Sequence, residues 1–422
     1  MPYSDSSGSV YDYPEIESVY RTGTKYIIPE LKDMIKLPYG SYLFSLPDRI
    51  PIGFDGKKIL EITEDGFGEK IQPVSSFLAS AYLRTYLPAY KNKSNPARLT
   101  LWAYAGASII NGKFHVPAIR IDDDIRSDPK FHENHEELET EIKKTTADFK
   151  NNRLVKQLAR CSTEYNCLCA RNFFLSRFEA PIPSSPSCNS DCAGCLSYQK
   201  DTSGFAASHG RLEFSPAPQE ISEVIFHHFE KTEKNAIASF GQGCEGEPLL
   251  RADDLSAAVK AVRKKTSSGT ININTNGSIP ENVSKLIDSG IDSIRISLNS
   301  PTENYYNLYH NPKNYTFSDV KKSIKTAINA GIFVSLNLFF MPGFTDMLTE
   351  VNSLFDFLDE FPVNMIQTRN LNIDPDYYFE KINYKEADII GILNLISMIK
   401  EKKPEIRLGY YNPCKEKFHI KP

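Results

Sequence analysis

Two stretches, Thr270-Ile-Asn-Ile-Asn-Thr-Asn-Gly277 and Asp292-Ser-Ile-Arg-Ile-Ser-Leu-Asn-Ser300, indicate the fold of this chain. In both, apolar residues alternate with polar ones, which is typical of a strand whose two faces meet different surroundings. Helical patterns flank both stretches, so we expect the apolar face to pack under helices and the amide-rich face to line a cavity. The alternative is a polar face that is open to solvent.

The same alternation of helix and strand extends along the chain from Ala217. The expected strands are a first one just before Cys188, then Ala236–Phe240, Thr270–Thr275, Asp292–Leu298, Phe333–Phe340, Val363–Thr368 and Ile406–Tyr410. A helix with apolar residues at helical spacing precedes each of the later strands, and two of these helices end near Gly290 and Gly331. The pattern predicts an α/β fold, a partial or complete (β/α) barrel of about six parallel strands plus an extra one.

The first 150 residues have a different pattern. Gly40–Leu46 and Lys58–Thr63 are strand-like, and Asn111–Gly112 lies between two strand-like runs, Leu99–Ile110 and Lys113–Ile121, as a type I′ turn does in a hairpin. We therefore expect a smaller, partly β N-terminal region.

A single long helix is predicted from about His132 to Arg160. The expected divisions are an N-terminal α+β accessory region (1–150), a linking helix and lead-in (151–180), the barrel (181–410) and a C-terminal tail (411–422).

Composition narrows the class of protein. With 41% hydrophobic and 24% charged residues the chain is an ordinary globular one, and its net charge of −4 makes nucleic acid an unexpected partner. Met1–Glu15 has no secretory pattern, and the longest apolar runs, such as Val334–Met341, are too short to cross a membrane. A cytoplasmic protein without a membrane partner is expected.

The strongest chemical signal is Cys188-Asn-Ser-Asp-Cys192-Ala-Gly-Cys195. Three thiols in one tight loop can hold an iron–sulfur cluster and leave one iron open to another ligand, because a fully ligated cluster normally takes four cysteines. The alternatives are a zinc knuckle or scattered structural thiols.

This CxxxCxxC spacing resembles the radical S-adenosylmethionine (radical SAM) superfamily. The resemblance implies a 4Fe–4S cluster on Cys188, Cys192 and Cys195 and SAM bound to the open iron, and it covers roughly Pro181 to Gly409. Members often have an aromatic residue before the third cysteine, where this chain has Gly194, so we expect different packing around the adenine.

Further residues match cofactor-binding positions of the superfamily. The segment Gly241-Gln-Gly-Cys-Glu-Gly-Glu247 is similar to its Gly-Gly-Glu motif, with Glu245 in place of the first glycine. The resemblance implies that Gly246, Glu247, Ser297 and Asn299 contact SAM, with Asn274 and Asn276 as weaker candidates. For each polar residue the alternative is simple solvation of a strand end.

Candidate substrate residues follow later strands. Phe339–Asp346 resembles the turn near the adenine, and Gln367, Arg369 and Asn370 lie at a polar strand end. Barrel enzymes gather their active residues at the carboxyl ends of the strands, so these should converge on the cluster side. Arg369 indicates a carboxylate or phosphate on the substrate, or else a structural ion pair.

Two features remain outside this pattern. Cys161, Cys167 and Cys169, with Cys244 or Cys414, could hold a second metal or cluster, or be buried small residues. The segment Leu196–Pro216 is expected to be a lid or substrate loop.

The expected function is that of a radical SAM enzyme, an oxidoreductase or transferase. It would cleave SAM reductively and abstract hydrogen from a small molecule, peptide or protein side chain, with flavodoxin or ferredoxin as electron donor. The alternatives are an RNA-modifying radical SAM enzyme and a non-catalytic iron–sulfur scaffold or maturation protein.

Overall fold

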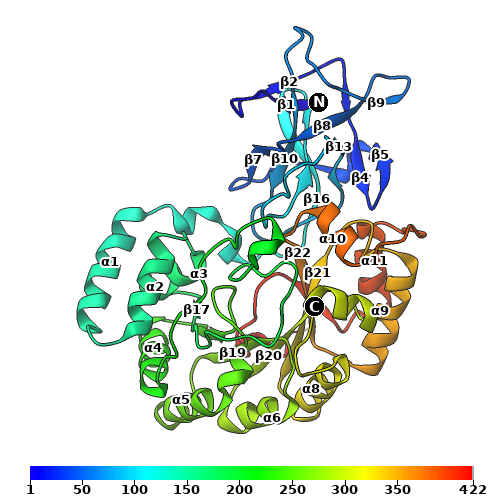
Figure 1. Ribbon diagram of the computed structural model, residues 1–422. Coiled ribbons are helices and arrows are strands. Elements are labelled where there is room, and N and C mark those ends of the chain that lie inside the picture. Colours follow the sequence, from blue (N-terminus) through cyan, green and yellow to red (C-terminus); the bar gives the residue numbers. More distant parts are fainter. Residues whose placement is uncertain (421–422) are drawn as a thin grey trace.

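A curved sheet of seven parallel strands forms the centre of the computed structural model, which describes residues 1–420 (Figure 1). The strands are β17 (Glu179–Pro181), β18 (Ile237–Phe240), β19 (Thr270–Thr275), β20 (Ser293–Leu298), β21 (Phe333–Phe340), β22 (Met365–Asn370) and β23 (Arg407–Gly409). Their order in the sheet follows the chain, with β17 and β23 at the two edges. The predicted α/β class is confirmed, and the sheet is a half-barrel.

Helices cover the outer face of this sheet (Figure 1). They are α4 (Pro218–Lys231), α5 (Ala252–Lys265), α6 (Pro280–Ser289), α8 (Phe317–Asn329), α9 (Leu348–Glu360) and α11 (Ile392–Lys402). Two more helices, α7 (Glu303–His310) and α10 (Pro375–Lys381), pack together in a separate hydrophobic cluster. The strands were predicted closely, whereas α7 and α10 lie outside the predicted units.

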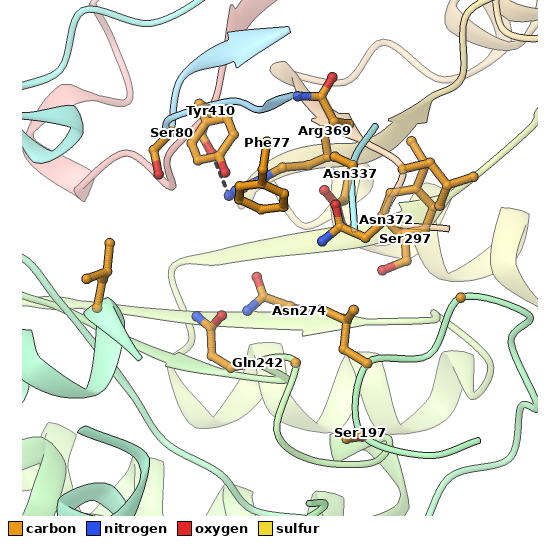
Figure 2. Close-up of a pocket in the computed structure, with 18 of the residues that line it drawn as sticks. Phe77, Ser80, Ser197, Gln242, Asn274, Ser297, Asn337, Arg369, Asn372 and Tyr410 are labelled. Carbon is orange, nitrogen blue, oxygen red and sulfur yellow. Dashed lines mark hydrogen bonds between the residues drawn. The ribbon is translucent and has the colours of Figure 1, made fainter. Parts of the chain in front are cut away.

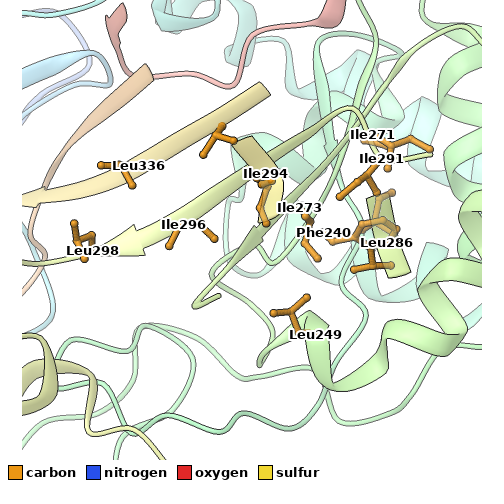
Figure 3. Close-up of a cluster of buried hydrophobic side chains, with 14 of the residues drawn as sticks. Phe240, Leu249, Ile271, Ile273, Leu286, Ile291, Ile294, Ile296, Leu298 and Leu336 are labelled. Atoms are coloured by element: carbon orange, nitrogen blue, oxygen red, sulfur yellow. The ribbon is translucent and has the colours of Figure 1, made fainter. Parts of the chain in front are cut away.

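The predicted parity of the strands is confirmed. Ile271 and Ile273 of β19 and Ile294 and Ile296 of β20 are fully buried in the main hydrophobic core, next to Leu286 of α6 (Figure 3). The alternate, polar residues of the same strands face the inside of the curve. A polar cavity rather than an open surface therefore occupies the concave side.

Small antiparallel sheets make up the N-terminal part, which lies over one end of the half-barrel (Figure 1). Their strands are β1 (Pro2–Ser4), β2 (Val10–Asp12), β3 (Glu17–Ser18), β4 (Tyr20–Thr22), β5 (Lys25–Ile27), β6 (Met34–Lys36), β7 (Tyr42–Ser45), β8 (Arg49–Phe54), β9 (Ile59–Glu61), β10 (Gln72–Phe77), β11 (Tyr82–Arg84), β12 (Leu87–Pro88), β13 (Tyr90–Asn92), β14 (Ala105–Gly106), β15 (Ser108–Ile110) and β16 (Lys113–Arg120). The predicted hairpin is present between β15 and β16, where Asn111 and Gly112 both have positive φ.

The long helix predicted from His132 to Arg160 is wrong in its continuity. Two helices, α1 (His135–Asp148) and α2 (Arg153–Thr163), take its place, and α3 (Leu168–Phe174) follows. Asn152 interrupts the helix because its side chain accepts hydrogen bonds from the backbone of Leu154 and Val155, which caps a new helix there.

Two buried arginines fasten the N-terminal sheets to the end of the half-barrel. Arg49 pairs with Asp374 at 3.3 Å, and Arg84 donates to the carbonyl oxygens of Tyr104 and Leu371 at 3.0 and 2.9 Å. The N-terminal part is thereby held over the carboxyl ends of the strands. How the chain divides into independent domains, including the tail at 411–422 whose last two residues lie outside the described part, stays a prediction.

Short 3-10 helices complete the described secondary structure: Leu31–Asp33, Ile125–Ser127, Pro129–His132, Asp201–Ser203, Pro248–Arg251 and Lys415–Lys417. Among residues 1–420 no helix is long and apolar enough to span a membrane.

Candidate functional site

A cavity of about 1340 Å³ lies between the concave face of the half-barrel and the N-terminal sheets. Side chains from both parts line it: Ser197, Gln242, Asn274, Ser297, Asn337 and Arg369 come from the barrel, and Phe77 and Ser80 from the N-terminal part (Figure 2). The wall is rich in amides and hydroxyls, as the strand pattern predicted. The cavity is large enough for a cofactor and a second small molecule.

The predicted cysteine loop forms part of this wall. Cys188, Cys192 and Cys195 all line the cavity, and all three are free thiols of intermediate exposure. Burial raises the pKa of Cys188 to about 11 and that of Cys192 well above its usual value. Thiols in such surroundings stay protonated unless a cation binds beside them, because a metal deprotonates the thiol that it coordinates.

Two basic side chains contact the sulfur atoms of the loop. Arg211 donates to Sγ of Cys195 at 3.4 Å, and Nδ1 of His310 lies 3.3 Å from Sγ of Cys192. Burial lowers the pKa of His310 to about 3, so its ring is neutral at pH 7. Hydrogen bonds of this kind to cluster sulfurs are one of the factors that set a cluster's reduction potential.

Within residues 1–420 no group of three or more His, Cys, Asp or Glu side chains could hold a single metal ion. A cubane cluster has its irons at separate corners, so thiolates that hold it need not converge on one point. Three free thiols on one loop, facing one cavity, fit a cluster with one open iron. His310, which lines the cavity, also has its Nε2 atom buried without a hydrogen-bond partner.

The glycine-rich loop after β18 is joined to the cysteine loop through its backbone. The N–H groups of Gly246 and Glu247 donate to the carbonyl oxygens of Ser185 and Ser187 at 2.7 and 2.8 Å. A Cβ atom at position 246 would lie 2.0 Å from the oxygen of Ser187, so only glycine permits this approach. The two predicted motifs are therefore brought together at one wall of the cavity.

Glu247 has most of its hydrogen-bonding capacity satisfied within the protein. Its carboxylate accepts from the backbone N–H groups of Leu249 and Asn276 and from the hydroxyl of Thr275. Burial raises its pKa to about 7 despite these bonds. Glu247 lines the cavity, but its carboxylate is tied to the start of the next loop.

Sequence reasoning treated Glu245 only as a departure from the motif, whereas the structure gives it a central position. Its buried carboxylate accepts five hydrogen bonds, three from Ser184 and Ser185 and two from the backbone of Gly241 and Gln242. It thereby connects the segment before the cysteine loop to the loop after β18. Burial raises its pKa to about 7, and the hydrogen bonds oppose this shift.

The other predicted cofactor residues occupy two different settings. Asn274, Asn276 and Ser297 line the cavity, and the Asn276 amide also donates to Asn189 and Ser190 of the cysteine loop. Asn299 is buried beside α7, donates to the carbonyl of Tyr305 at 3.1 Å, and keeps an oxygen without a partner.

The predicted substrate residues also separate. Arg369 and Asn370 line the cavity, whereas Gln367 is buried below it and bonds to Arg295 and Asn412. The Asn370 amide donates to the carbonyl of Tyr82, which places it at the contact with the N-terminal sheets. Position at a strand end therefore did not show which of these residues line the cavity.

Cys161, Cys167 and Cys169 lie near the N-terminal edge of the half-barrel sheet. The neighbouring Cys244 thiol lowers the pKa of Cys161, and Cys169 donates to the carbonyl of Glu179 at 3.3 Å. Cys167 is half-buried at the start of α3, and Cys414 is buried in the tail. A second metal or cluster here stays a prediction.

The structure explains Gly194. A Cβ atom at this position would lie 2.8 Å from the hydroxyl of Tyr309, which is buried on α7 and lines the cavity. Tyr309 also packs edge-on against Phe339. An aromatic side chain from α7 thus occupies the space beside the third cysteine, and no local sequence signal could have shown this.

Comparison with known proteins supports the chemistry of the site. Residues 182–357 match the model of the radical SAM superfamily. A curated protein of Methanosarcina acetivorans, named a probable GTP 3′,8-cyclase, is 24% identical over 239 residues, which cover 54% of this chain and 63% of that protein. The chain thus spans less than two thirds of that relative.

Solved structures give lower overall similarity. A structure named native anSMEcpe with bound AdoMet has a TM-score of 0.38 at 16% identity and covers 46% of this chain and 52% of its own. Streptococcus suis SuiB bound to S-adenosylmethionine has a TM-score of 0.40 at 14% identity, covering 61% and 54%.

The superfamily so matched uses a 4Fe–4S cluster and SAM. The matched segment contains all three cysteines, the glycine-rich loop and the polar ends of β19 and β20. Residues 182–357 of this chain therefore match the radical SAM superfamily, and no subfamily is assigned.

Proposed function

We propose that this protein is an enzyme that binds a 4Fe–4S cluster through Cys188, Cys192 and Cys195, cleaves SAM reductively and abstracts hydrogen from a substrate held in the polar cavity. A small molecule, a peptide or a protein side chain could be that substrate. When bound, the reduced cluster supplies the electron that converts SAM into methionine and a 5′-deoxyadenosyl radical.

One observation carries the proposal: the cysteine loop and the glycine-rich loop are fastened together at the wall of a single large cavity. A bare cluster scaffold needs the thiols alone. Here the Gly246 and Glu247 backbone and the Glu245 carboxylate hold the two loops in a fixed relation, and the remaining cavity has room for two ligands. This favours a catalytic protein over a scaffold.

Different residues of the chain would contact different parts of the bound SAM. Gly246 lets the glycine-rich loop lie against the cysteine loop, and Ser297 and Asn276 would offer polar groups to the ribose and carboxylate of SAM. Asn299 has an oxygen free to accept a hydrogen bond. Glu247 orients the loop through its three hydrogen bonds, and the carboxylate oxygen that accepts only from the Asn276 backbone keeps capacity to accept from an ammonium.

The N-terminal sheets would exclude water from the radical. Tyr42, Phe77 and Tyr82 line the cavity from the N-terminal part, which the buried contacts of Arg49 and Arg84 hold against the half-barrel. Closing an active site in this way prevents side reactions of a reactive intermediate. The segment Leu196–Pro216, of which Leu196 and Ser197 line the cavity, is proposed as part of the same cover.

The test is anaerobic reconstitution with iron and sulfide, followed by dithionite and SAM and an assay of 5′-deoxyadenosine. Wild-type protein should form deoxyadenosine, and Cys192→Ala should form none. An intact, reduced cluster that binds SAM and never releases deoxyadenosine, with flavodoxin or ferredoxin as well as with dithionite, would contradict the proposal.

A further inference from the structure

Two arginines on the concave face of the half-barrel lack an acidic partner. Arg295 of β20 and Arg369 of β22 both line the cavity. Asn337, on the strand β21 between theirs, lines it too, and Figure 2 shows Asn337 beside Arg369. In the described part of the chain neither guanidinium forms a salt bridge. Strand parity places all three groups toward the ligand space.

Their existing hydrogen bonds leave donors available. Arg295 is nine-tenths buried and donates from Nη1 to Gln367 at 2.7 Å, while its Nε has no partner. Arg369 donates from Nη2 to the carbonyl of Tyr410 at 2.6 Å, and the Tyr410 ring lies 3.7 Å from its Cζ. The Asn337 amide oxygen is buried without a partner, so rotation of that amide breaks no bond there.

In the described residues the Glu179 carboxylate, whose charge acts on Arg295, forms no salt bridge with either arginine. Glu179 accepts hydrogen bonds from Gln242 and Asn412 and lies 3.8 Å from Arg126, so its charge is already shared. Burial and, to a lesser extent, the charge of Arg369 together lower the pKa of Arg295 to about 9. Two like charges that are largely buried side by side raise the free energy of the folded protein, and a bound anion would offset that cost.

We propose that Arg295 and Arg369 form the binding site for an anionic group of the substrate, a phosphate or a carboxylate, which rests on the function proposed above. Guanidinium forks match the oxygens of either group. Phe77 and Ser80, which face Arg369 from the N-terminal part, would contact the remainder of the substrate (Figure 2).

SAM also carries a carboxylate, which is the competing occupant. Ser297 lies two residues after Arg295 on β20, so the proposed cofactor site and the arginine pair are neighbours. If the arginines held the SAM carboxylate, their loss would weaken SAM binding rather than binding of a separate anion. The experiment must therefore follow both ligands.

The probes are pyrophosphate and succinate, titrated calorimetrically into cluster-loaded, full-length protein saturated with SAM at low salt. We expect one of them to bind, and Arg295→Gln and Arg369→Gln each to weaken it about tenfold or more, as loss of a hydrogen bond to a charged group does. The anion that binds identifies the group. Arg160→Gln, which removes the same charge from an exposed position on α2, should change nothing.

Three results decide the matter. No binding of either anion to wild type, or equal binding to wild type and both variants, would overturn the inference. A loss of SAM affinity in the variants would assign the pair to the cofactor and also overturn it. Failure of wild type itself to bind SAM would instead count against the proposed function. If Arg295→Gln does not fold, the variants Arg369→Gln and Arg369→Lys, at a half-buried position, decide alone.

Discussion

Replacing Glu245 by glutamine should loosen the connection between the two cofactor loops. Glutamine keeps one side-chain oxygen, and its NH₂ group must then face backbone donors that the second oxygen now satisfies. The less costly orientation retains the bonds from Ser184 and Ser185 and loses those from Gly241 at 2.6 Å and Gln242 at 3.3 Å. The loss leaves two N–H groups without an acceptor.

The expected loss of stability follows from these two broken hydrogen bonds. A hydrogen bond to a charged group contributes about 1.5–3 kcal/mol, and the longer bond contributes less than the shorter one, so the free energy of unfolding at pH 8 should fall by roughly 2–4 kcal/mol. The measurement is urea unfolding of the cluster-free chain. Glu230→Gln, at an exposed position near the end of α4, is the control and should cost about 0.5 kcal/mol or less.

The difference between wild type and Glu245→Gln should also depend on pH. The pKa of Glu245 is raised from 4.5 to about 7, so the folded wild type takes up a proton before the unfolded chain does. This stabilises wild type as pH falls from 7 toward 4.5, by up to about 1.4 kcal/mol per pH unit, and the difference should widen. A variant as stable as wild type at pH 8, with a constant difference down to pH 5, would refute the role of Glu245.

Three further predictions concern other parts of the chain. Gly246→Ala places a Cβ 2.0 Å from the carbonyl of Ser187, so we expect a loss of about 1–3 kcal/mol in urea unfolding and weaker SAM binding in calorimetry; unchanged values for both would contradict the close approach. Gly194→Ala should lower the iron content of the reconstituted protein, because the added Cβ would lie 2.8 Å from the Tyr309 hydroxyl, and adding Tyr309→Phe should restore it. If the two substitutions lower the iron content additively, the hydroxyl is not the obstacle. Burial lowers the pKa of His228 from 6.5 to about 4, so as pH falls below 6.5 the unfolded chain binds a proton that the folded chain does not. The free energy of unfolding of wild type, relative to that of His228→Gln, should therefore fall by about 1.4 kcal/mol per pH unit until about pH 4. Stabilities of the two proteins that change with pH in parallel would count against this.

The barrel could be predicted because its signals are local. Strands β19 and β21 follow the predicted ranges residue for residue, since apolar side chains alternate with polar ones and the helices end at glycines. Gly290 has the positive φ of a helix C-cap. The structural role of such residues can be predicted from the residue type and its immediate neighbours in the sequence.

The interruption at Asn152 could not be predicted from periodicity. Apolar residues at helical spacing continue across it, and only the capping bonds to Leu154 and Val155 divide the helix. Polar residues inside an apolar pattern can either face solvent or cap, and the sequence alone does not distinguish these outcomes.

The cysteine loop and the glycine-rich loop could be found from spacing, but the contacts between distant segments could not. Glu245, Tyr309 and Arg295 acquire their positions from partners that are 60 to 116 residues away in the sequence. Gln367 and Asn370 looked alike as strand-end residues, yet one lies below the cavity and the other contacts the N-terminal sheets. Tertiary packing, not local pattern, separates them.

Electron paramagnetic resonance of the reduced, reconstituted protein tests the central claim most directly, because it observes the cluster and its open iron. Wild type should contain about four irons per chain and give a 4Fe–4S⁺ signal that changes when SAM is added. Cys188→Ala, Cys192→Ala and Cys195→Ala should each lose that signal. A cluster that forms equally well without these cysteines, or a signal that SAM leaves unchanged, would contradict the account.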